Sequence, residues 1–306
     1  MAVPTLRHEA LLYADDAEYL SAVGSFVRDG LGEGRPIFVA VPGDRGELLK
    51  QVLNGDAGRV TLADMTQLGR NPGTIIPAVR TFMRAHIGQP LRFVGEPIWP
   101  GRTTDEIAEA TRHESLINLA FAGTSAHILC PYDIRRLDAP VVSDAYRTHP
   151  ALISRSSYVA SAHYADPAVV CHADAWPLRV PPSGAYVVEC AVERLADIRA
   201  LVRAHARTAG LSDTRIDDVV LAVDELCYNT MKYSPTVGTL RIWRDCDELV
   251  CEVHDTGRIT DLLAGRRLVP PGAMHGRGLF LVNHLSDLVQ LRSDDHGTTI
   301  RLHISL

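Results

Sequence analysis

Short apolar runs alternate with longer amphipathic stretches over the first 140 residues of the chain. Three runs, PIFVAV (36–41), LRFVGE (91–96) and AHILCPYD (126–133), have the length and composition of buried strands. Residues 17–31 repeat apolar side chains at three- and four-residue steps, as a helix does, and residues 107–120 are a second candidate helix. The alternation predicts an α/β domain with a mainly parallel sheet covered by helices.

A proline-containing stretch interrupts this pattern between residues 143 and 184. Proline lacks a backbone donor and restricts the residue before it. We therefore expect residues 143–184 to be a linker with at most short helical pieces, between one domain over residues 1–142 and another over residues 185–306. The prolines concerned are Pro150, Pro167, Pro177, Pro181 and Pro182.

The second domain has a different pattern, in which strands pair locally and helices are amphipathic. We expect an α+β domain, with strand runs at 185–192, 239–245, 248–255, 288–293 and 298–304 and helices at 195–209, 216–233 and 278–287.

Composition and charge exclude some classes of function. The 306 residues are 46% hydrophobic and 22% charged, which is ordinary for globular domains, and the net charge of -6 disfavours direct nucleic-acid binding. The longest apolar runs fall short of the roughly 18 residues of a membrane helix, so we expect a cytoplasmic protein without membrane contact. The six cysteines show no C-x-x-C pair, and we expect reduced, structural thiols rather than a metal site.

The predicted helix over residues 216–233 carries candidate chemistry. At about 100° per residue, Glu225 and Asn229 share one face, while Val219, Val223 and Leu226 share another. A carboxylate beside an amide oxygen suits magnesium, which takes oxygen ligands and shares them with phosphates. The alternative is a polar face that is merely solvated.

Three further elements follow in order. Asp255, at the end of a strand run, precedes Gly257, and a glycine there lets a flat base approach the backbone. The run His275-Gly276-Arg277-Gly278-Leu279 opens a helix, where backbone N–H groups can bind phosphates. Thr298, on the last strand, can supply a hydroxyl near the base. A single G-x-G is weak, but four elements in this order predict a nucleotide site.

With these motifs, residues 185–306 resemble the GHKL ATPase domain of DNA gyrase, Hsp90 and histidine kinases, and most closely the anti-sigma-factor serine kinases. The resemblance implies a two-layer α+β sandwich with a mixed sheet and helices on one side. It implies ATP and Mg²⁺ as cofactors, with a sigma factor and a STAS-type anti-anti-sigma protein as partners. Homodimers are common among the resembling kinases.

The resemblance also assigns roles to individual residues. It makes Glu225 the base that accepts the proton of an attacking hydroxyl, and Asn229 the magnesium ligand. The remaining residues would bind the nucleotide: Asp255 and Thr298 the adenine, Gly257 its neighbourhood, and Gly276, Gly278 and Leu279 the phosphate end. The chain departs from the family pattern at Thr256 and at Arg258-Ile259. The loop 258–274 is the expected lid, and we expect its Arg266 and Arg267 to be solvated rather than to contact phosphates.

Residues 6–140 resemble the MEDS sensory domain, which is related to RecA- and KaiC-like ATPases, through the segments 8–13, 92–96 and 129–133 and a strand before Val41-Pro42. The phosphate loop of RecA-like domains is replaced by PGDRGE (42–47), so we expect no ATP hydrolysis in this domain. Another ligand can use the cleft at the strand ends. Four residues are candidates for a sensory pocket, although packed or capped side chains are the alternative we favour: His8, Tyr13, Glu96 and Cys130.

Two functions remain open. The first is an ATP-dependent regulator, an anti-sigma factor and protein serine kinase under the control of a sensory domain. The second is a nucleotide-dependent module that sequesters a protein partner without transferring phosphate. An output kinase of another signalling pathway is a third, weaker interpretation.

Overall fold

The computed structural model describes residues 5–154, 157–270, 272 and 276–306 of the chain. It divides into two compact units, Met1–Cys171 and His172–Leu306, and each is described by itself. Among the described residues, the helices are all too short or too polar to span a lipid bilayer.

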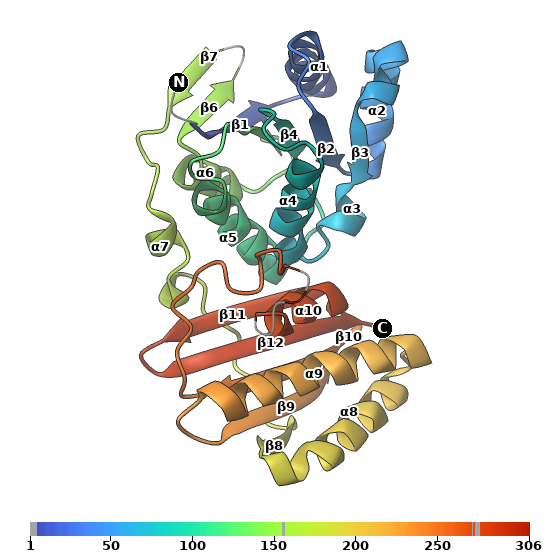
Figure 1. The fold of residues 1–306 in the computed structure, drawn as a ribbon, viewed down its shortest axis with the longest axis vertical. Helices are drawn as coiled ribbons and strands as arrows, with labels where there is room; N and C mark the ends of the chain where they lie inside the picture. Colours follow the sequence, from blue (N-terminus) through green and yellow to red (C-terminus); the bar gives the residue numbers. More distant parts are fainter. Residues whose placement is uncertain (1–4, 155–156, 271, 273–275) are drawn as a thin grey trace. The chain divides into compact units, whose positions relative to one another are not determined.

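The first unit is built on one seven-stranded sheet (Figure 1). All neighbouring strands are parallel except the last pair, which is an antiparallel hairpin. The mainly parallel α/β domain that the alternation predicted is confirmed. In order across the sheet the strands are β3 (Thr61–Asp64), β2 (Ile37–Val41), β4 (Arg92–Gly95), β5 (His127–Asp133), β1 (Arg7–Tyr13), β6 (Ala151–Ser154) and β7 (Ser157–Ala160).

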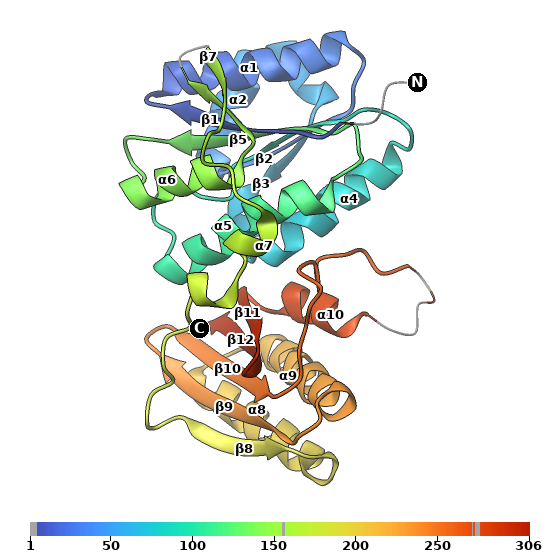
Figure 2. The ribbon, with the colours of Figure 1, turned by 90° about the vertical axis from the view of Figure 1, so that its left-hand side faces the viewer.

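Helices cover both faces of this sheet. Figure 2 shows α1 (Asp16–Gly32) and α2 (Gly43–Leu53) on one face, with α4 (Ile75–Ala85), α5 (Thr104–Ala120) and α6 (Ala139–Thr148) on the other. Strands β2 and β5 are buried along their whole length, which is why they appear as continuous apolar runs rather than alternating ones. Two further short helices are α3 (Met65–Leu68) and α7 (Pro167–Val170).

Side-chain caps begin several of these helices, among them α1 and α5. Asp15 accepts from the Glu18 N–H at the start of α1. Thr103 and Glu106 form a reciprocal capping box at the start of α5. α5 is also buried from Ala108 to Ile117 and at Ala120, and the buried side chains include the charged Glu109 and Glu114. A helix this polar inside a protein must satisfy its charges with internal partners.

The stretch 143–184 contains more structure than the expected linker. Strand β6 pairs in parallel with β1, and β7 pairs with β6. Ala151 and Leu152 are buried, so the chain gains apolar burial by joining the sheet immediately after Pro150. Strands of four residues carry too few positions for a periodicity to predict them.

The second unit has a five-stranded sheet in the order β11-β12-β10-β9-β8. Its neighbouring strands are all antiparallel, which corrects the mixed sheet implied by the resemblance. The strands are β8 (Tyr186–Cys190), β9 (Gly238–Asp245), β10 (Glu248–Asp255), β11 (Leu288–Asp294) and β12 (Gly297–Ser305), and the helices are α8 (Leu195–Ala209), α9 (Asp213–Tyr233) and α10 (Gly278–Leu285).

The core of the second unit lies between the sheet and these helices (Figure 2). Leu249, Cys251 and Val253 alternate inward on β10, so every second residue of the strand faces the helices. Val219 and Val223 of α9 pack against the same core, and the apolar face predicted for this helix is confirmed. The second unit is a two-layer α+β sandwich, as expected.

Candidate functional site

Helix α9 holds Glu225 and Asn229 side by side, each half-buried. Helix α10 begins directly over them at Gly278. A methyl group on Gly278 would lie 2.7 Å from Glu225 Oε2 and 3.1 Å from Asn229 Nδ2. A side chain at this position would displace the ends of Glu225 and Asn229, so the glycine lets α10 begin close to the acid and amide pair without moving them. The first N–H groups of a helix are unsatisfied donors at its positive end, so the arrangement brings anion-binding groups next to oxygen ligands for a cation.

Asp255, the last residue of β10, is held by two donors. The Thr230 hydroxyl donates to Asp255 Oδ2 at 2.7 Å, and the Gly257 N–H donates to Oδ1 at 2.7 Å. An ionised carboxylate offers about four acceptor positions, so two donors leave capacity for a ligand. The carboxylate is oriented by the protein and can still accept a hydrogen bond from an amine.

Thr298 lies opposite Asp255 in the pairing of β12 with β10. Its hydroxyl donates to the Gly257 carbonyl at 2.8 Å and lies 2.8 Å from Ser293 Oγ. Thr298 is 4% exposed. The threonine thus fixes the Asp255 to Gly257 turn.

A cavity of about 630 Å³ opens between α9, the sheet and the segment that follows β10. Its walls are partly apolar, with Leu226, Val253 and Ile300, and the size is that of a small-molecule site. The lining includes seven of the eight residues singled out from the sequence: Asn229, Asp255, Gly257, Gly276, Gly278, Leu279 and Thr298. Glu225 is not in the lining, but its Oε2 lies against Gly278 at the edge of the cavity.

The expected lid is described over residues 258–270 and at Gly272. Asn283 of α10 donates to the Gly265 carbonyl at 3.1 Å, which joins the lid to the helix. Arg267 is exposed and forms an ion pair with Asp261. Arg266 is 7% exposed, so the expectation that it would be solvated is wrong. Pro271, Ala273, Met274 and His275 lie outside the described residues.

Sequence reasoning missed two supporting groups of this site. Thr230 lies on the buried, apolar face of α9, yet its hydroxyl orients Asp255. A polar residue on a predicted apolar face was the available signal. Asn283 gave no such signal, because its contact with Gly265 depends on how the lid folds back.

In the first unit, the candidate pocket residues separate into two places. Tyr13 donates to Glu96 at 3.0 Å beneath the carboxyl ends of the strands. Burial raises the pKa of Glu96 to about 8, although the Tyr13 hydrogen bond and the Arg45 charge oppose the shift. His8 and Cys130 lie elsewhere, together and fully buried.

A cleft of about 510 Å³ lies at these strand ends, lined by Asp15, Asp16, Arg45, Asp133 and neighbouring residues. Arg45, from the segment that replaces a phosphate loop, forms ion pairs with Asp16 and Asp133. The guanidinium group is thus neutralised by this chain's own acids.

The antiparallel sheet, the helices on one face and the cavity between them define a histidine kinase-like two-layer sandwich. Comparison with protein families agrees. Residues 188–304 match the histidine kinase-like ATPase domain, and residues 7–150 match MEDS, the methanogen/methylotroph DcmR sensory domain. The chain therefore carries a MEDS domain followed by a histidine kinase-like ATPase domain.

Among solved structures, the chain is similar to the RsbU and RsbW domains of Rv1364c from Mycobacterium tuberculosis. The match has 18% sequence identity and a TM-score of 0.31, and it covers 42% of this chain and 34% of that chain. The match thus spans about a third of the length of that solved chain. No curated protein matches the chain.

Proposed function

We propose that the second unit binds ATP with Mg²⁺ in the cavity between α9 and the sheet. The convergence of Asn229, Asp255, Gly278 and Thr298 on one cavity of about 630 Å³ is the observation that carries the proposal. These residues come from four separate elements of the chain, α9, β10, α10 and β12. Their meeting in a domain of the histidine kinase-like ATPase family supports an adenine nucleotide as the ligand.

The residues present fit each part of that ligand. Asp255 retains acceptor capacity for the amino group of adenine, and a purine without this amine would leave that remaining acceptor position unfilled. Leu226, Val253 and Ile300 offer apolar walls to the base. Gly276 and Gly278 present backbone without side chains, as phosphates require, and Asn229 offers an amide oxygen to Mg²⁺. Bound magnesium would supply charge neutralisation for the phosphates.

We further propose that the protein is a signalling regulator of the anti-sigma-factor kinase type. Its partners would be a sigma factor and a STAS-type anti-anti-sigma protein, and the MEDS domain would control the choice between them. In this account Glu225 accepts the proton from a serine hydroxyl of the STAS protein. The position of its Oε2 against Gly278, next to Asn229, supports that role. Phosphoryl transfer depends mainly on positioning and charge stabilisation, which such an arrangement can provide.

One observation favours the alternative function, a nucleotide-dependent module that sequesters its partner. Glu225 does not line the cavity, although Asn229 in the next turn does. A base at the edge of the site, outside the lining of the cavity, would allow nucleotide binding without transfer of phosphate. The two functions therefore differ in what Glu225 does when a partner is bound.

The deciding experiment incubates the full chain with γ-labelled ATP, magnesium and a STAS-type protein. The kinase proposal predicts labelled serine on the partner, loss of label with Glu225→Gln, and unchanged ATP affinity in that variant. Asp217→Asn is the matched control, because Asp217 lies on the same helix, is exposed and pairs with Arg203. ATP binding without label on the partner would replace the kinase with the sequestering module.

A further inference from the structure

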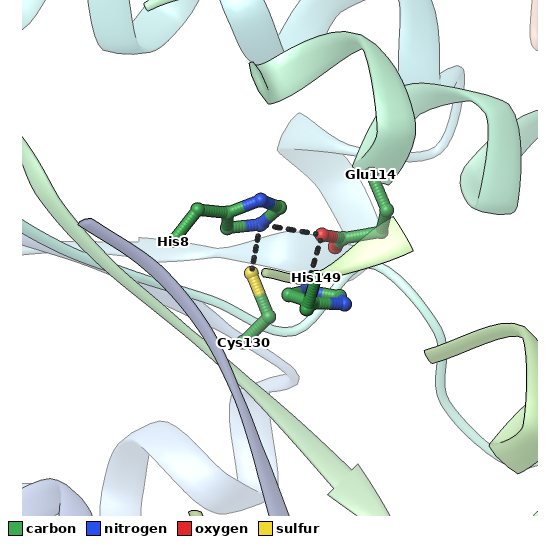
Figure 3. A group of neighbouring side chains, drawn as sticks. All are labelled: His8, Glu114, Cys130 and His149. Carbon is green, nitrogen blue, oxygen red and sulfur yellow. Dashed lines mark hydrogen bonds and ion pairs between the residues drawn. The ribbon is translucent and has the colours of Figure 1, made fainter. Parts of the chain in front are cut away.

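Four buried side chains of the first unit meet in one place (Figure 3). His8 comes from β1, Cys130 from β5, Glu114 from α5 and His149 from the residue after α6. One nitrogen, sulfur or oxygen atom of each lies within 4.8 Å of the corresponding atoms of the others. The exposed fraction is 2% for His8 and 0% for Glu114, Cys130 and His149.

The distances between these atoms are short. Glu114 Oε2 lies 3.1 Å from His8 Nε2 and 3.1 Å from His149 Nε2, and Cys130 Sγ lies 3.4 Å from His8 Nε2. In a tetrahedral zinc site, neighbouring ligand atoms lie roughly 3.3 to 3.8 Å apart, as follows from metal–ligand bonds of about 2.0 to 2.3 Å. The cluster therefore already has the spacing of a metal site to within about 1 Å.

The outer ring nitrogens of both histidines are already used. His149 Nδ1 lies 2.9 Å from the Ala145 carbonyl oxygen, which can only accept. The Thr148 hydroxyl, 3.0 Å from the same nitrogen, donates to the Asp144 carbonyl at 2.9 Å, so His149 Nδ1 carries the proton. His8 Nδ1 lies 3.0 Å from Asn118 Oδ1. The Asn118 amide is oriented by its Nδ2, which donates to the Ser115 and Thr148 carbonyls. Both Nδ1 atoms are therefore donors, and in neutral rings both Nε2 lone pairs face the centre of the cluster.

The centre of the cluster brings hydrogen-bond acceptors close together. Two Nε2 lone pairs and the Glu114 carboxyl group converge, and without a metal their contacts need either a proton on this buried acid or a buried imidazolium. The Cys130 thiol lies 3.4 Å from His8 Nε2 and has a single proton to donate. Among the described residues, Glu114 Oε1 has no hydrogen-bond partner although it is buried. Buried acceptors without donors are costly, and a cation at the centre would bind both Nε2 atoms, the Cys130 sulfur and one Glu114 oxygen at once. Outer nitrogens that donate to carbonyl groups are also the usual support of histidines that bind metals.

We propose that His8, Glu114, Cys130 and His149 form a site for a divalent transition metal ion, with zinc as the ion that fits best. Two imidazoles, a thiolate and a carboxylate are ligands for zinc rather than for calcium or magnesium, which take oxygen ligands. Four protein ligands and no solvent exposure describe a closed, structural site. The ion would tie together β1, β5, α5 and the end of α6.

The first test measures metal binding to the full chain after removal of metal with a chelator. Zinc added alone is expected to bind at one ion per chain through this site and to raise the thermal midpoint of the first unit. Cobalt(II) in its place is expected to show the intense visible bands of tetrahedral coordination and a thiolate-to-cobalt charge-transfer band. Cys130→Ser should lose the charge-transfer band, whereas Cys171→Ser, which changes another buried cysteine of the same unit, should keep it.

The second test does not depend on the folding of a variant. X-ray absorption of the zinc-loaded wild-type chain should show one sulfur ligand together with nitrogen and oxygen ligands. Failure of zinc and cobalt to bind stoichiometrically would overturn the proposal and leave a metal-free hydrogen-bonded network. Coordination without sulfur, or an unchanged charge-transfer band in Cys130→Ser, would overturn it as well.

Discussion

The Thr230 hydroxyl donates to Asp255 Oδ2 at 2.7 Å, which joins the helix that carries Glu225 and Asn229 to the acid at the end of β10. Thr230→Val keeps the shape of this buried side chain but removes the donor. We expect the second unit to lose about 1 kcal/mol of stability, the usual net value of one hydrogen bond, and ATP affinity to fall by about five- to tenfold. Calorimetric titration and urea unfolding measure the two effects.

Thr236→Val is the control for this substitution. It also removes a threonine hydroxyl, but this hydroxyl is exposed and its hydrogen bond goes to the Thr256 hydroxyl, not to Asp255. Equal ATP affinity in Thr230→Val and wild type would mean that the orientation of Asp255 does not matter for the nucleotide.

Gly278→Ala tests the close approach of α10 to α9. The added methyl group would meet the ends of the Glu225 and Asn229 side chains, which can move, so the fold should survive. A helical alanine is also favoured over glycine by up to about 1 kcal/mol, which offsets part of the strain. We expect a nearly unchanged thermal midpoint without nucleotide and a much smaller rise when ATP and magnesium are added.

The comparison for Gly278→Ala is Gly184→Ala, where a methyl group would enter open space. A full nucleotide-dependent rise in Gly278→Ala would contradict the proposal that this part of α10 lies at the phosphates.

Glu96 makes the stability of the first unit depend on pH. Its pKa is raised by burial from an ordinary value of 4.5 to about 8, so the folded state keeps a proton that the unfolded state has released. The free energy of unfolding should therefore fall as the pH rises from about 4.5 through about 8, and Glu96→Gln, which imitates the neutral acid, should flatten this fall.

Unfolding of the first unit at several pH values in this range measures the effect. Glu47→Gln, at an exposed acid that pairs with Lys50, should keep the wild-type slope. An equal slope in Glu96→Gln would show that another group causes the pH dependence.

Much of the fold could be predicted because amphipathic periodicity marks long elements well. The expected helix 195–209 and strand 248–255 match α8 and β10 residue for residue. Strands β6 and β7 were missed because four residues do not establish a period, and because proline-containing segments resemble linkers. The burial of Arg266 depends on how the lid packs, which no local pattern records.

The two sites differed in how far the sequence could predict them. The nucleotide residues stand in short motifs on successive elements, so their order along the chain was itself a signal. The ligands of the proposed metal site are separated by up to 141 positions, from His8 to His149, and are single residues without metal-ligand spacing. Only the pairing of β1 with β5, and the packing of α5 against them, brings these ligands together.

The affinity of the full chain for ATP with magnesium, measured by calorimetric titration for wild type and Asp255→Asn, tests the central claim most directly. The amide would present a donor to Thr230 or Gly257, both of which already donate to Asp255, at a cost of about 1 to 3 kcal/mol. We predict one ATP per wild-type chain, and binding at least about tenfold weaker both in Asp255→Asn and for GTP in place of ATP. Asp247→Asn, at an exposed acid just before the same strand, should bind as wild type. Equal ATP affinity in Asp255→Asn and wild type, or no binding by wild type, would contradict the account.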